Sequence, residues 1–166
     1  MCEHPHHLLI LACSQRKRTT PGLLPALDRY DGVNFRVLHK ALREGYWPDG
    51  LRILIISAKF GLLEADQPVL NYNLRITRDI ALGFQESISQ RLDEVLRERA
   101  WKGVFINLGR DYLPAVAASS ELTRLSKGVL YAEGGIGERM ADRLPESWSI
   151  PKVRIPRDDE PEGGRL

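Results

Sequence analysis

The sequence predicts an α/β fold, a three-layer sandwich with a mostly parallel central sheet of about four strands. Two observations predict it. Four short apolar runs are rich in Leu, Ile and Val without polar alternation, which is typical of strands covered on both faces. Segments with helical periodicity lie between these runs, and strands that alternate with helices form βαβ units with right-handed crossovers.

The apolar runs are the expected strands, and they cover residues 8–12, 53–56, 104–106 and 129–131. The connection 61–73 carries Pro68, so we expect an extended loop over the sheet edge. Three helices are expected from apolar residues that share one face, with Thr77 and Asp79 at the start of the second. These stripes are Phe35, Leu38 and Leu42; Phe84, Ile88, Leu92 and Leu96; and Ile136, Met140 and Leu144, before Pro145.

The length of 166 residues fits a single α/β domain over residues 1–150, followed by a proline-rich, partly flexible extension over 151–166. The 43% hydrophobic and 28% charged fractions argue against disorder or a coiled coil. No apolar run approaches the roughly 20 residues that cross a bilayer, so no membrane partner is expected. Two cysteines, Cys2 and Cys13, indicate a reducing compartment, and we expect a cytoplasmic protein.

Each expected strand ends in a polar or glycine-containing turn. Carboxyl ends of parallel strands meet at one edge, where ligands of open α/β sheets bind. We therefore expect one positively lined crevice for an anionic ligand with a planar part. Phosphates would be neutralised by cations and approached by backbone at glycines, aromatic rings would stack on a base, and amides would read its edge. The candidate binding residues are Cys13, Ser14, Ser57, Tyr72, Asn73, Asn107, Gly109, Arg110, Gly135, Gly137 and Arg139.

Several alternatives stay open at this point. Tight strand-to-helix packing explains Gly135 and Gly137 as well as phosphate binding does. Cys13 reads more readily as a small buried thiol than as a nucleophile, because no histidine is placed to activate it. No Walker loop is present, and no glycine fingerprint follows the first strand, so we expect no nucleotide cofactor. The histidines near the N-terminus lack a second ligand cluster, and no metal is expected.

Three short motifs in order resemble a widespread bacterial and phage domain with the pattern ACSxxK, SAKYGLL and PYDxxL. Here they read ACSQRK from residue 12, SAKFGLL from residue 57 and NYNL from residue 71, where Asn73 replaces the usual Asp. Their order and spacing are also similar to the YaaA peroxide-stress family, and the first motif to a domain of archaeosine synthase. These families resemble the uracil-DNA glycosylase superfamily in their expected fold, which implies a protein that acts on, or binds, nucleobases in nucleic acid.

The resemblance and the crevice together lead us to expect a DNA glycosylase-like hydrolase that excises an unusual or modified base, in repair or anti-phage defence. Asp111 or Asp66 would act on the water, while Lys17 and Lys59 would hold phosphates or the leaving base. No cofactor is expected, DNA is the expected partner with tRNA as the alternative, and the protein is expected to be a monomer. The alternatives are DNA binding without chemistry, as in the YaaA type, and transfer onto a deazaguanine of tRNA.

Overall fold

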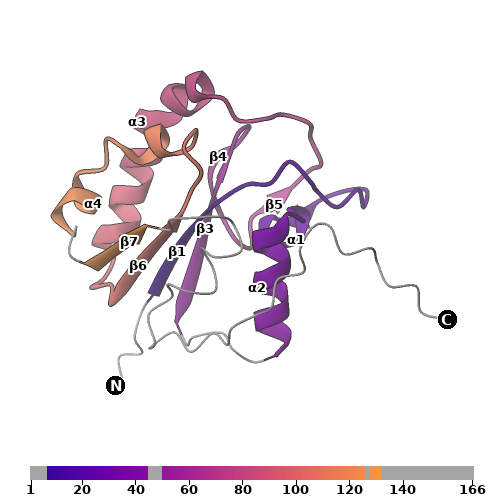
Figure 1. Ribbon diagram of the computed structural model, residues 1–166, viewed down its shortest axis with the longest axis horizontal. Coiled ribbons are helices and arrows are strands. Elements are labelled where there is room, and N and C mark those ends of the chain that lie inside the picture. The colour runs from indigo at the N-terminus through magenta and orange to yellow at the C-terminus, as the bar shows by residue number, and fades with distance from the viewer. Residues whose placement is uncertain (1–6, 45–49, 126–127, 132–166) are drawn as a thin grey trace.

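The computed structural model describes residues 7–44, 50–125 and 128–131 and shows a sheet between two layers of helices (Figure 1). The expected third helix, Gly135, Gly137, Arg139 and the extension 151–166 lie outside the described residues. The elements in chain order are β1 (His7–Ala12), β2 (Leu24–Pro25), α1 (Ala26–Arg29), α2 (Val33–Arg43), β3 (Leu51–Ser57), β4 (Gly61–Glu64), β5 (Pro68–Val69), α3 (Arg78–Arg97), β6 (Gly103–Asn107), the 3₁₀ helix η1 (Leu113–Val116), α4 (Ser120–Arg124) and β7 (Val129–Tyr131).

The main sheet has the strand order β4-β3-β1-β6-β7. β1 pairs in parallel with β3 on one side and with β6 on the other, and β6 pairs in parallel with β7. The four expected strands are thus present and parallel, which confirms the predicted α/β sandwich. None of the helices in the described part of the chain combines the length and the apolar character that crossing a membrane requires.

Both faces of the sheet are buried, which explains why the strands carry continuous apolar runs. In β1, Leu8 and Ile10 pack in the core beneath α3, whereas Leu9 and Leu11 pack in the core beneath α2. Successive strand side chains point to opposite faces, so a strand between two helical layers needs apolar residues at every position. Figure 1 shows α3 and α4 on one side of the sheet and α2 on the other.

The two long helices follow the expected periodicity, with one exception. Thr77 caps α3 by accepting a hydrogen bond from the N–H of Ile80 at 3.2 Å, as its position before the stripe predicted. In α2, Phe35 and Leu38 are buried, but Leu42 is 48% exposed. Ala41, three residues after Leu38 on the same helix face, takes the buried position in the last turn instead.

The prediction of a loop over residues 61–73 is wrong. Residues 61–64 form β4, which turns back at Gly61 and pairs antiparallel with β3, and residues 68–69 form β5, which pairs with β2. Gly61 has φ +73°, a left-handed conformation that suits glycine and lets the chain reverse. Pro68 is tolerated in β5 because this strand has two residues and belongs to a two-stranded sheet with β2, so both strands are edge strands.

A buried carboxylate joins α3 to α4. Asp93 accepts hydrogen bonds from the hydroxyls of Ser119 and Ser120 and from the N–H of Glu121 at 3.2 Å. Burial opposes its ionisation, but these donors outweigh that effect and hold the pKa of Asp93 below its usual value. Ser119 in turn caps α4 through the N–H of Leu122.

We expect Asp93→Asn to destabilise the protein by about 1–3 kcal/mol at neutral pH, because an amide nitrogen replaces one carboxylate oxygen, so one donor loses its acceptor and the other bonds lose the charge of theirs. The folded-state pKa is depressed, so the contribution of the carboxylate is complete above its unfolded pKa of about 3.9 and is lost as the pH falls through the folded value. Urea unfolding should therefore show wild type and variant converging towards acid pH. Glu86→Gln, at an exposed position of α3, should change neither curve; a pH-independent gap for Asp93→Asn would contradict the prediction.

Candidate functional site

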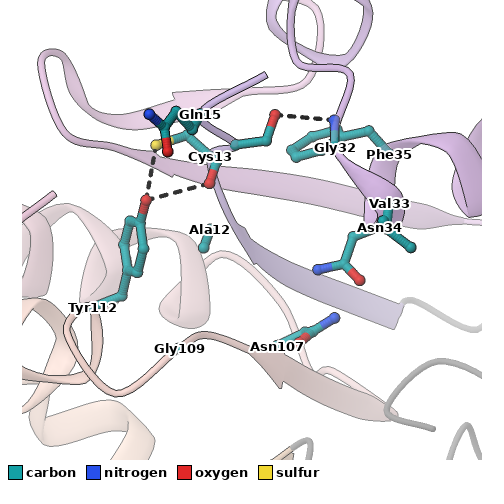
Figure 2. Close-up of a pocket in the computed structure, with 11 residues that line it drawn as sticks. Ala12, Cys13, Gln15, Gly32, Val33, Asn34, Phe35, Asn107, Gly109 and Tyr112 are labelled. Atoms are coloured by element: carbon teal, nitrogen blue, oxygen red, sulfur yellow. Dashed lines mark hydrogen bonds between the residues drawn. The ribbon is translucent and has the colours of Figure 1, made fainter. Parts of the chain in front are cut away.

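A hollow of about 300 Å³ lies at the carboxyl ends of β1 and β6 (Figure 2). The chain leaves β1 towards β3 on one side, whereas β6 lies on the other side, so the strand order reverses at this point. Such a reversal opens a crevice between the departing loops, and ligands of open α/β sheets bind there. The hollow therefore occupies the position where this topology places a ligand.

Neutral side chains line the hollow in the described part of the chain. Two segments that follow β1 and β6 meet the beginning of α2 there. The lining residues are Ala12, Cys13, Ser14, Gln15, Gly32, Val33, Asn34, Phe35, Asn107, Gly109 and Tyr112. This set combines three side-chain amides with two aromatic rings and includes no cation. It differs from the positively lined crevice that we expected.

The beginning of α2 is held against the loop after β1 by a close contact. The N–H of Gly32 donates to the hydroxyl of Ser14 at 3.1 Å, and that hydroxyl donates to the carbonyl of Arg16 at 2.6 Å. A Cβ on residue 32 would lie 2.6 Å from the Cβ of Ser14, so this position requires glycine. The Ser14 hydroxyl, a predicted ligand contact, is therefore engaged in fixing one wall of the hollow.

Cys13 and Tyr112 close one side of the hollow through a pair of hydrogen bonds. The phenol of Tyr112 donates to the carbonyl of Cys13 at 3.2 Å, and its oxygen lies 3.1 Å from the thiol sulfur. Burial, followed by the neighbouring Cys13, raises the pKa of Tyr112 well above its usual value. The phenol stays protonated at neutral pH, and its ring is a fixed planar surface across from Asn34 (Figure 2).

A second cluster lies beside the hollow, centred on Tyr72. Ser57 is fully buried, and its oxygen accepts the N–H groups of Lys59 and Phe60, both at 3.1 Å. Its own proton is then directed to the Tyr72 hydroxyl at 2.8 Å, which also bonds Tyr30 at 2.6 Å. Ser57, a predicted ligand contact, is therefore bonded within the fold and does not line the hollow.

The two predicted lysines approach the same cluster. The ammonium of Lys17 lies 4.3 Å from the ring centroid of Tyr72 and donates to the carbonyl of Gln15 at 3.2 Å. That of Lys59 lies 5.8 Å from the same ring and 5.5 Å from the Phe60 ring. Burial lowers the pKa of Lys17 from its usual value. Neither lysine lines the hollow; both lie at the Tyr72 cluster.

A buried arginine fixes the loop that carries Lys17. Arg29, at the end of α1, is fully buried and donates to the main-chain carbonyls of Arg18, Thr20, Gly22 and Val69. A guanidinium has five N–H donors in a planar fork, so one side chain can hold several strands of backbone at once. No sequence pattern singled Arg29 out, because a lone arginine in a polar stretch reads as a surface residue.

The structure brings together only part of the predicted set. Cys13, Ser14, Asn107 and Gly109 line the hollow, and Tyr72, Lys17 and Lys59 form the neighbouring cluster. Asn73 and Arg110 are exposed outside the lining.

The two carboxylates predicted to act on the water, Asp111 and Asp66, lie in different parts of the structure. Asp111 is exposed next to Tyr112, and its charge acts on that phenol. Asp66 is misplaced as a site residue: β4 runs antiparallel, so Glu64 pairs with Leu54, and the chain reaches Asp66 on its way away from the carboxyl edge. The described residues hold no group of three or more His, Cys, Asp or Glu side chains placed to bind a metal ion.

Asn34 is the functional candidate that the sequence did not reveal. It lies in the first turn of α2 and lines the hollow, and its Oδ1 is buried without a hydrogen-bond partner among the described residues. Buried amide oxygens are rarely left unpaired. Rotation about the terminal bond brings either the oxygen or the nitrogen to the hollow, so a ligand can pair with this amide. Only the fold indicates this, because one Asn two residues after Gly32 in a sequence is an ordinary helix start.

Comparisons with known proteins add little to this geometry. No protein-family model matches the chain, and no curated protein matches it. Among solved structures, the chain is similar to the crystal structure of AF0587, a protein of unknown function. The TM-score is 0.46 at 16% identity, and the match covers 91% of this chain and 47% of that chain. The chain thus spans about half the length of that protein.

Proposed function

We propose that the protein binds a nucleobase extruded from nucleic acid in the hollow and hydrolyses its N-glycosidic bond, as a DNA glycosylase-like enzyme for a modified base. The observation that carries the proposal is the lining of the hollow. Amides of Gln15, Asn34 and Asn107 provide both donors and acceptors, and the rings of Phe35 and Tyr112 provide planar apolar surface. A nucleobase is a neutral, planar ligand with a donor and acceptor edge, so it matches this set.

The dimensions and the charge distribution agree with an extruded base. A hollow of about 300 Å³ is at the small end of ligand pockets and suits one base rather than a whole dinucleotide. The cations lie outside it, with Lys17 and Lys59 at the neighbouring cluster and Arg110 exposed after β6. A neutral pocket suits the uncharged base, and cations outside the pocket suit the phosphates of the strand that carries it.

The reaction needs a group that directs water at the sugar and a group that stabilises the departing base. When the bond between the sugar and the base nitrogen breaks, the electron pair leaves with the base, and water adds to the sugar carbon. In this proposal Asp111, which is exposed and whose charge acts on the lining residue Tyr112, accepts the proton of that water. The amide of Asn107, 2% exposed at the floor of the hollow, pairs with the edge of the base as charge develops on it.

Incubation with naturally modified phage DNAs, followed by mass spectrometry of released bases and detection of abasic sites, tests the proposal. Free base together with abasic sites is the expected result. Tight, salt-dependent binding without free base would instead identify a binding protein of the YaaA type. A mass gain on tRNA would identify a transferase, and either outcome would overturn the hydrolase proposal.

We expect Asp111→Asn to slow base release by about 10²–10⁴-fold, since it removes the proton acceptor while keeping the shape of the side chain. Asp66→Asn is the matched control and should leave the rate unchanged, because β4 carries Asp66 away from the site. Single-turnover rates of base release on the same DNA measure both variants. Equal rates for Asp111→Asn and Asp66→Asn would remove Asp111 from the mechanism.

A further inference from the structure

Four aromatic rings form a row that begins at the wall of the hollow and ends at the surface. Phe35 lines the hollow, and its ring centroid lies 5.4 Å from that of Tyr30. Tyr30 is followed by Tyr72 at 6.3 Å, and Tyr72 by Phe60 at 5.3 Å. We call these four side chains the aromatic row. It connects the candidate base pocket to the turn between β3 and β4.

Exposure rises along the aromatic row. Phe35 and Tyr30 are buried, Tyr72 is half-buried, and Phe60 is 43% exposed. The Phe60 ring is held edge-on to Tyr72 at 89°, and its backbone is fixed by Ser57. Because the Phe60 ring is exposed, packing in the core does not account for it. A large aromatic ring held in place at the surface can stack on a planar ligand.

Two lysine side chains lie close to the rings of the aromatic row. Lys17 lies over both Tyr30 and Tyr72, at 5.8 and 4.3 Å from their centroids. Lys59 lies over Phe60 and is itself exposed, so its ammonium can move to a phosphate. Aromatic platforms for bases combined with cations for the backbone are the arrangement by which proteins hold unpaired nucleic acid.

We propose that the exposed end of the aromatic row, Tyr72 and Phe60, is the binding path for a single-stranded segment of nucleic acid, in which a nucleotide flanking the base in the hollow stacks on Phe60. Lys17 and Lys59 contact the phosphates of this segment. The inference rests on the proposed function, because it takes the hollow as the position of the first base. It names the substrate class as unpaired strand, since a base within a duplex has both faces stacked on its neighbours and none free for the ring.

Binding of a labelled mixed-sequence DNA, single-stranded or as a duplex, tests the path by fluorescence anisotropy at fixed salt. We expect Phe60→Ala to weaken single-strand binding about 10- to 100-fold and to leave duplex binding unchanged. Leu82→Ala, at a 45% exposed position of α3, is the matched control and should bind like wild type. Lys59→Ala should reduce the slope of log affinity against log salt by about 0.7 for the single strand.

Two outcomes would overturn the path: single-strand affinity of Phe60→Ala equal to that of Leu82→Ala, or an equal loss on single strand and duplex. These results are distinguishable from failure of the proposed function, which is measured by free base. If base release proceeds while Phe60→Ala binds normally, the path is wrong and the hydrolase proposal stands. If Phe60→Ala loses single-strand binding and no modified DNA releases a base, the path stands and the hydrolase proposal falls.

Discussion

Replacing Arg29 with Met is expected to lower the free energy of unfolding by about 3–5 kcal/mol, the largest effect that we expect from a single side chain. The guanidinium is fully buried and donates to four main-chain carbonyls, from Arg18, Thr20, Gly22 and Val69. Methionine fills similar volume but donates to none of them. Those carbonyls must then find water or remain unpaired, and the loop that carries Lys17 loses its anchor.

Urea unfolding measures this effect, and Arg36→Met is the matched control. Arg36 lies half-exposed on α2 and contacts Asp31 at 3.4 Å, so its replacement should cost no more than about 1 kcal/mol. Hydrogen exchange should also show earlier exchange of the Arg18 amide in the Arg29 variant, because that amide donates to the carbonyl of Arg29 at 2.8 Å and the loop loses its restraint. Similar unfolding midpoints for the two variants would show that the buried guanidinium contributes nothing to stability.

Replacing Asn107 with Leu is expected to slow base release by about 10²–10³-fold, the loss typical of removing one group that stabilises a developing negative charge. Asn107 ends β6 and is 2% exposed at the floor of the hollow. Leucine keeps the volume of the side chain and removes its hydrogen-bonding edge. The measurement is the single-turnover rate of free base release, with circular dichroism as the check that the variant is folded.

Two further variants separate a role in the site from a role in folding. Gln90→Leu removes an exposed amide of α3 and should release base at the wild-type rate. Asn34→Ala removes an amide whose oxygen the described structure leaves without a partner, so it should lower base release without loss of stability. Wild-type rates in folded Asn107→Leu and Asn34→Ala together would place the reaction elsewhere.

The sequence predicted the layers of the fold well because periodicity reports burial directly. Runs such as residues 8–12 are apolar at every position only when both faces of a strand are covered, and that condition alone implies helices on both sides. The prediction failed at β4, where the long connection with Pro68 indicated a loop. Pairing of residues 61–64 with β3 is a contact between backbones, which leaves a weak trace in side-chain pattern.

By itself the sequence determined a parallel α/β sandwich whose polar turns follow its strands, because strand order along the chain and apolar patterning are local properties. Tertiary structure decided the chemistry at those turns. Neutral amides line the hollow, whereas Lys17 and Lys59 lie against the aromatic row. Ser57 is hydrogen-bonded within the fold, and β4 leads the chain away from the carboxyl edge of the sheet before Asp66. Which side chains share a cavity depends on strand order in the sheet and on loop path, and both are set by contacts between residues far apart in the chain.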